Sequence, residues 1–87
     1  MLKISGYEVN SERPLFLSEV CIQASPDDLE MLVKFLDATI LEMKKWGPKF
    51  GHEHFNDWRE KNGAIVLPGD IIVVNPTLGE SAAQKAD

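Results

Sequence analysis

The sequence predicts an α+β fold, in which one long helix packs on one face of a mainly antiparallel sheet of four to five strands, in the order ββαβ(β)β. Two observations support this fold class. Two short apolar segments precede a long stretch with helical periodicity, and two or three further apolar segments follow it. We expect residues 1–75 to form a single domain and residues 76–87, which lack a periodic apolar pattern, to form a mobile polar tail.

The two segments before the helix are expected to pair as an antiparallel hairpin. Residues 2–9 alternate apolar and polar side chains, and residues 15–24 are rich in Leu, Phe, Val and Ile. Residues 10–14 between them have the composition of a loop. Within the second segment, the face that holds Phe16 and Val20 is the better candidate for the core.

The central helix is predicted at 26–46. Ser25 is a favourable N-cap, a proline occupies the first helical position, and two carboxylates lie near the positive end of the helix dipole. The Gly-Pro pair that follows ends the helix, and Trp46 at its last turn is expected to lie in the core. Apolar side chains recur every three or four residues on one broad face: Leu29, Met31, Leu32, Val33, Phe35, Leu36, Ala38, Ile40 and Met43.

Three further strands are predicted after the helix. Residues 49–55 form the first, and a single helical turn capped by Asn56 and closed by Gly63 follows it. Residues 64–67 form a short strand, a Pro-Gly type II turn comes next, and residues 70–75 form the last strand. One helix leaves the other face of such a sheet bare, which is the physical argument for an interaction protein.

Composition narrows the choice of partner and compartment. Fourteen acidic against nine basic residues give a net charge of −5, which disfavours nucleic acid and favours a basic protein partner. Cys21 is the only cysteine, so no internal disulfide forms, as suits a reducing compartment. The first residues lack the apolar run of a signal peptide, and no segment approaches the length of a membrane span. We therefore expect a cytoplasmic protein that does not bind membranes.

The chemistry of the chain is concentrated in residues 50–58. In a strand, His52 and His54 share one face and Glu53 points to the other. Two imidazoles can hold a metal, pair with an acidic partner or fill a half-buried surface, and residue types alone do not choose among these roles. A catalytic metal needs about three protein ligands, so no cofactor is expected. The alternative is a metal-binding domain or small metal-dependent enzyme that uses His52 and His54, completed by ligands shared across a homodimer.

Other routes to catalysis have weaker support. Cys21 lies in an apolar segment, where cysteine usually behaves as a small hydrophobic residue. The sequence has no glycine-rich phosphate loop and no nucleophile elbow. We therefore expect a protein that is not an enzyme.

A family resemblance points in the same direction. His-x-His-Phe at 52–55, the following Asp57-Trp58 and the Asp-Ile-Ile-Val-Val-Asn segment at 70–75, placed after a long helix, resemble small immunity proteins encoded beside bacterial polymorphic toxins. The resemblance covers about a third of the chain. It implies a non-catalytic cytoplasmic protein that binds and neutralises a cognate toxin domain. The partner-binding candidates are His52, Glu53, His54, Asp57 and Trp58.

Overall fold

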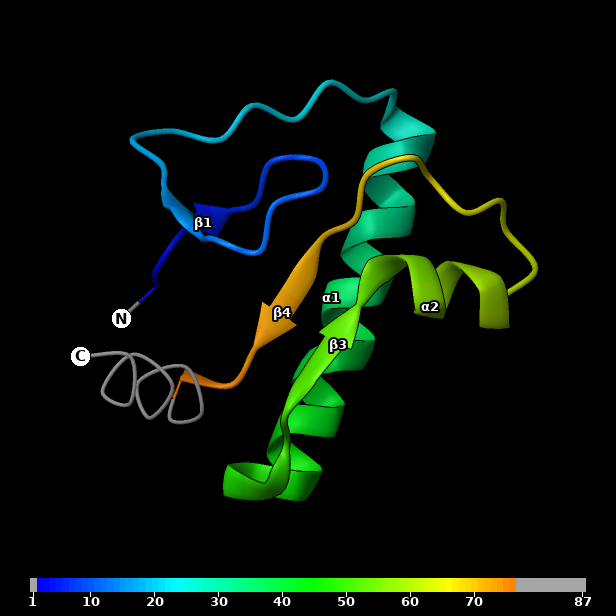
Figure 1. The fold of residues 1–87 in the computed structure, drawn as a ribbon. Helices are drawn as coiled ribbons and strands as arrows, with labels where there is room; N and C mark the ends of the chain where they lie inside the picture. The colour runs from blue at the N-terminus through cyan, green and yellow to red at the C-terminus, as the bar shows by residue number, and fades with distance from the viewer. Residues whose placement is uncertain (1, 77–87) are drawn as a thin grey trace.

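The computed structural model describes residues 2–76, and within them it contains two α-helices, one 3₁₀ turn and two separate two-stranded sheets (Figure 1). The predicted tail at 76–87 lies outside the described residues except for Pro76. No helix among the described residues is both long enough and apolar enough to cross a membrane. The elements in chain order are β1 (Ser5–Gly6), β2 (Leu15–Phe16), α1 (Pro26–Trp46), η1 (Gly47–Lys49), β3 (His52–His54), α2 (Phe55–Lys61) and β4 (Ile72–Val74).

The predicted sheet of four to five strands is wrong. β1 pairs with β2 and β3 pairs with β4, both antiparallel, and no ladder joins the two pairs within residues 2–76. The predicted N-terminal hairpin therefore exists, but each of its strands is two residues long, and residues 64–67 form no strand. A strand is stabilised by side chains that pack across and beneath it. Phe16 and Val20 are exposed instead of buried, so this support is missing.

α1 has the bounds that its sequence predicts. The Ser25 hydroxyl accepts a hydrogen bond from the Asp28 backbone N–H at 3.2 Å, and the Asp28 carboxylate accepts one from the Ser25 N–H at 3.3 Å. This capping box satisfies two N–H groups that the first helical turn leaves without partners. At the other end, Gly47 has a φ of 54°, which glycine adopts without steric cost, and η1 follows. Local signals thus define both ends of α1.

α2 is longer than the single turn that was predicted. It spans seven residues, and its N-cap is His54 rather than Asn56, with no side-chain capping bond. Gly63 closes the segment as expected, with a φ of 75° and its N–H bonded to the Glu60 carbonyl at 3.1 Å. Starting the helix at Phe55 places this ring in the core, where it is buried.

The core is small and aromatic. Phe35 of α1, Phe50 and Phe55 are the buried hydrophobic residues of the described chain, and Phe35 is completely inaccessible. The rings of Phe35 and Phe55 lie 5.0 Å apart between centroids, which is a favourable separation for aromatic pairs. Figure 1 shows β3 lying across α1, β4 alongside β3, and α2 following the end of β3. The core therefore lies where this two-stranded ribbon meets the helix.

Asn75 fastens the end of β4 to the chain that follows α1. Its side-chain amide donates to the carbonyls of Gly47 at 3.0 Å and Phe50 at 2.8 Å. Its backbone N–H donates to the Gly51 carbonyl at 2.9 Å. Asn75 is itself buried, so these hydrogen bonds are shielded from water and hold the open end of the β3–β4 ribbon together.

Much of the predicted apolar face of α1 is not covered. Within that helix, only Phe35 and Thr39 are buried. Trp46, which was expected in the core, is 50% exposed, and its indole N–H donates to the Glu42 carboxylate at 2.8 Å. The β1–β2 hairpin does not cover the face either, because Figure 1 shows it to one side of the molecule, joined to α1 by a long extended segment. Most of the apolar face of α1 is therefore open within residues 2–76.

Candidate functional site

The β3–β4 ribbon presents two chemically different faces. His52 pairs with Val74, Glu53 with Val73, and His54 with Ile72. Residues that face each other in an antiparallel pair share one side of the ribbon. One side, here called the outer face, therefore carries His52, His54, Ile72 and Val74, while Glu53 points to the side of α1, as the alternation of the sequence predicted.

The two histidine rings on the outer face lie in contact. Their centroids are 5.0 Å apart and their planes are inclined by 73°. The His54 Nδ1 atom lies 2.7 Å from the Asp70 Oδ2 atom, and both side chains are about one-third exposed, at 34% and 27%. Asp70 was not among the sequence-predicted site residues. In the sequence, Asp70 is an acidic residue at the start of the predicted last strand. This position does not distinguish it from an ordinary polar residue at the end of a strand.

The Asp70 carboxylate is held on both oxygens. Besides the contact to His54, its Oδ1 atom accepts hydrogen bonds from the backbone N–H groups of Asn56 at 2.9 Å and Ile71 at 2.8 Å. Partial burial raises the pKa of Asp70, but the hydrogen bonds from Asn56, His54 and Ile71 and the charge of His54 together lower this pKa below its ordinary value. The carboxylate therefore stays ionised at neutral pH and orients the His54 ring through Nδ1.

The outer face offers two metal ligands rather than three. Among residues 2–76, no group of three or more His, Cys, Asp and Glu side chains is placed to hold one ion. Both Asp70 oxygens are already engaged, so Asp70 acts as the orienting partner of His54. Cys21 is exposed in the segment before α1. Any complete metal site on this face needs a ligand from outside the described chain.

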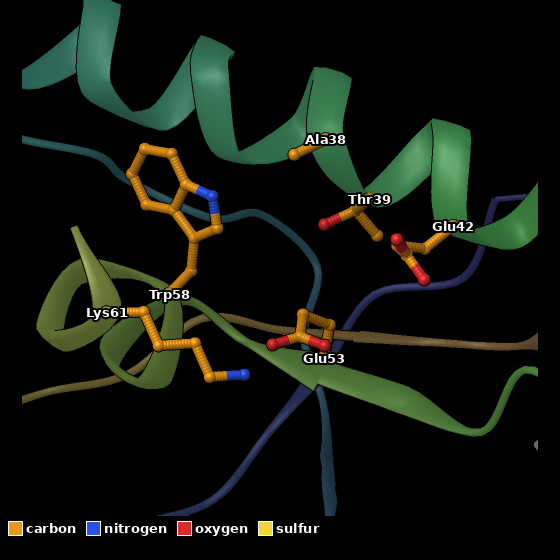
Figure 2. Close-up of a pocket in the computed structure, with 6 residues that line it drawn as sticks. All are labelled: Ala38, Thr39, Glu42, Glu53, Trp58 and Lys61. Atoms are coloured by element: carbon orange, nitrogen blue, oxygen red, sulfur yellow. The ribbon is translucent and has the colours of Figure 1, made fainter.

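A hollow of about 320 Å³ lies on the other side of the ribbon, between α1, β3 and α2. Figure 2 shows Trp58 and Glu53 facing Thr39 across it. We call it the Trp58 hollow, and its lining residues are Ala38, Thr39, Glu42, Glu53, Trp58 and Lys61.

Trp58 is held rigidly in the wall of this hollow. Its ring packs edge-on against Phe35, with 6.0 Å between centroids, and stacks with Phe55 at 6.1 Å. The indole is neither buried nor fully exposed. A side chain that is fixed from behind and accessible in front loses little conformational entropy when it binds a partner.

The charges around the Trp58 hollow are mainly acidic. Glu42 and Glu53 contribute two carboxylates, and Lys61 contributes one ammonium group. A neighbouring hollow of about 290 Å³ is lined by Asp57, Glu60 and Lys61, which adds two more carboxylates. Four carboxylates against one amine make this region attractive to a cation.

The five sequence-predicted site residues are thus divided among three places. His52 and His54 lie together on the outer face, Glu53 and Trp58 line the Trp58 hollow, and Asp57 lines the neighbouring one. The charged residues that sequence reasoning missed are Glu42, Glu60, Lys61 and Asp70. Glu42 and Lys61 belong to helices, where their sequence spacing is that of ordinary solvated positions.

Comparison with known proteins adds no relative: the chain matches no protein-family model, no curated protein and no solved structure. The resemblance to immunity proteins therefore rests on the short motifs of the chain alone. The function of the protein is therefore inferred from the geometry of the described residues.

Proposed function

We propose that this protein is a non-catalytic cytoplasmic binding domain of the immunity type, which neutralises a basic toxin domain by binding it at the Trp58 hollow. The observation that carries the proposal is an accessible indole, fixed by Phe35 and Phe55, beside the carboxylates of Glu42 and Glu53. Tryptophan is enriched among residues that dominate binding energy at protein interfaces. The net charge of −5 supports a basic partner, because complementary fields accelerate association.

An arginine side chain of the partner fits this arrangement best. A planar guanidinium group stacks on an indole and donates paired hydrogen bonds to a carboxylate. The Thr39 hydroxyl is neutral and already donates to the Phe35 carbonyl at 2.8 Å, so it does not compete with a guanidinium group for the carboxylates. Lys61 lines the same hollow and disfavours a second cation, so we expect one basic anchor at this point.

The test measures binding and neutralisation of a cognate basic toxin domain, which the proposal expects to be encoded next to this protein. We expect Glu53→Lys to weaken binding by at least about tenfold and to abolish protection of growth, because it places a like charge against the basic anchor. Glu19→Lys is the matched control, since it makes the same charge change at an exposed position before α1. Titration calorimetry measures the affinities. Equal affinities for the two variants would contradict the proposed site.

A second comparison separates the hollow from the outer face. The double variant His52→Ala/His54→Ala removes both imidazoles on the opposite side of the ribbon. We expect it to bind the same toxin domain with wild-type affinity. A loss confined to this double variant would place the interface on the outer face instead. Circular dichroism of each variant checks that the fold is intact.

One observation favours a second candidate function, a metal-binding site on the outer face. His54 is oriented by a carboxylate, as metal-ligating histidines usually are, and the His52 ring lies beside it. Native mass spectrometry with added Zn²⁺ tests this function. Stoichiometric zinc that is lost in His52→Ala/His54→Ala supports it, and an empty protein at high zinc concentration contradicts it.

A further inference from the structure

A second apolar stripe runs along α1, beside the face that covers the core. Its four central side chains are between 39% and 55% exposed: Leu29, Val33, Leu36 and Ile40. At 3.6 residues per turn, this stripe is centred about 120° around the helix from the buried Phe35. It shares no residue with the Trp58 hollow. The stripe is therefore a separate surface that the described chain leaves uncovered.

The spacing of the stripe is that of a coiled-coil seam. Its members follow one another at intervals of four, three and four residues, and the half-buried Met43 continues the pattern. In heptad terms, Val33 and Ile40 occupy a positions, and Leu29 and Leu36 occupy d positions. A second helix with the same pattern complements this stripe.

We propose that the stripe binds the same stripe of a second copy of this chain, as an antiparallel two-fold dimer of α1. The flanking charges indicate the orientation. Glu30, Asp37 and Lys44 occupy successive e positions, and antiparallel seams bring e positions of the two helices together. Such a pairing, centred near residue 37, places each Glu30 opposite the Lys44 of the other copy.

A parallel pairing has no such complementarity. It brings Asp37 and Lys44 against the g positions of the other copy, which are Leu32 and Thr39. Neither of these residues is charged. The antiparallel pairing has one cost, because the two Asp37 carboxylates face each other at the two-fold axis. Two attractive contacts offset one repulsive contact.

Sedimentation of the full chain tests the dimer. We expect the fraction of dimer to rise with the concentration of wild type, as mass action requires for an associating pair. Leu36→Asp buries a charge in the seam, so we expect it to raise the dimer dissociation constant by at least about a hundredfold. Leu41→Asp is the matched control, because Leu41 is 68% exposed on a different side of α1. Its dissociation constant should equal that of wild type.

Charge exchange tests the orientation. Glu30→Lys alone and Lys44→Glu alone should each weaken the dimer about tenfold, since each creates two like-charge contacts. The double variant restores the opposite charges and should regain wild-type affinity. A double variant that stays as weak as the single ones overturns the antiparallel arrangement. A wild-type monomer at the highest concentration overturns the dimer and leaves the stripe to the N-terminal segment or another partner.

Discussion

Asn56 joins the start of α2 to the loop that precedes β4. Its amide oxygen accepts from the Leu67 N–H at 2.9 Å, and its amide nitrogen donates to the carbonyls of Leu67 at 3.0 Å and Gly69 at 3.2 Å. We expect Asn56→Ala to lower the free energy of unfolding by about 1–2 kcal/mol, since three hydrogen bonds are lost at a partly exposed site. Urea denaturation measures this change. Asn62→Ala, which removes one bond to the Trp58 carbonyl, should cost less.

Asp70 makes stability depend on acid pH. Its folded-state pKa lies below the ordinary value of 3.8, so the folded state binds a proton less readily than the unfolded chain. Its stabilising contribution is therefore complete above the unfolded-state pKa and is lost as pH falls through the depressed folded-state pKa. We expect the unfolding free energies of wild type and Asp70→Asn to differ at neutral pH and to converge in strong acid. A constant difference down to strong acid would contradict this role.

At the scale of single residues, the sequence predicts which face of a strand a side chain occupies better than it predicts which distant residues that side chain contacts. Strand alternation correctly separates Glu53 from His52 and His54. The ring of His54 and the backbone of Asn56 both meet Asp70, which lies 16 and 14 residues away. The periodicity of a sequence does not predict contacts between residues that are so far apart in the chain. The Pro-Gly pair does not form the type II turn that was predicted, because Gly69 lacks a positive φ and its carbonyl bonds to Asn56 instead.

The helix start is the most sharply specified element. The Ser25 hydroxyl and the Asp28 carboxylate satisfy each other's backbone N–H groups. Ser25→Ala should lower the free energy of unfolding by about 1 kcal/mol, the usual cost of losing an N-cap side chain. Thermal unfolding followed by circular dichroism measures the change. Ser18→Ala, at an exposed position outside the secondary structure, should leave the melting temperature unaltered.

The sequence predicts the bounds of α1 more accurately than the bounds of the strands. α1 is recognised to the residue because its cap, its charges and its terminal glycine all act within a few residues. The strands shrink to two or three residues because their length depends on neighbours that periodicity cannot identify. Residues 64–67 are apolar like a strand, yet their backbone groups form hydrogen bonds with side chains instead of with another strand. The Asn56 amide bonds to the N–H and carbonyl of Leu67, and the Arg59 guanidinium donates to the Ile65 carbonyl.

At the scale of the molecule, stability depends on very few buried side chains. Phe35 is completely buried and packs against the rings of Phe55 and Trp58. Phe35→Ala should therefore cost about 3–5 kcal/mol, which is a large part of the stability of so small a domain. We expect it to unfold at room temperature or in low urea. Leu41→Ala, at an exposed site of the same helix, should unfold like wild type.

The small core also explains why the fold class was only partly predictable. The single helix and the α+β composition follow from the sequence, but the expected sheet required the N-terminal hairpin to join β3 and β4. Nothing in the alternation of residues 2–9 specifies which edge they pair with. The apolar residues that a larger sheet would have buried therefore remain at the surface.

The hydrogen bonds of Asn75 to Gly47, Phe50 and Gly51 have a mechanical consequence. β3 and β4 run antiparallel, and Asn75 lies at their open end, opposite Gly51. A pulling force applied at residue 76 and at α1 would therefore load the ribbon bonds one after another, beginning with those of Asn75, rather than all at once. An unfoldase that pulls on residue 76 would therefore break the hydrogen bonds of the ribbon in sequence, and the first to break would be those of the Asn75 side chain.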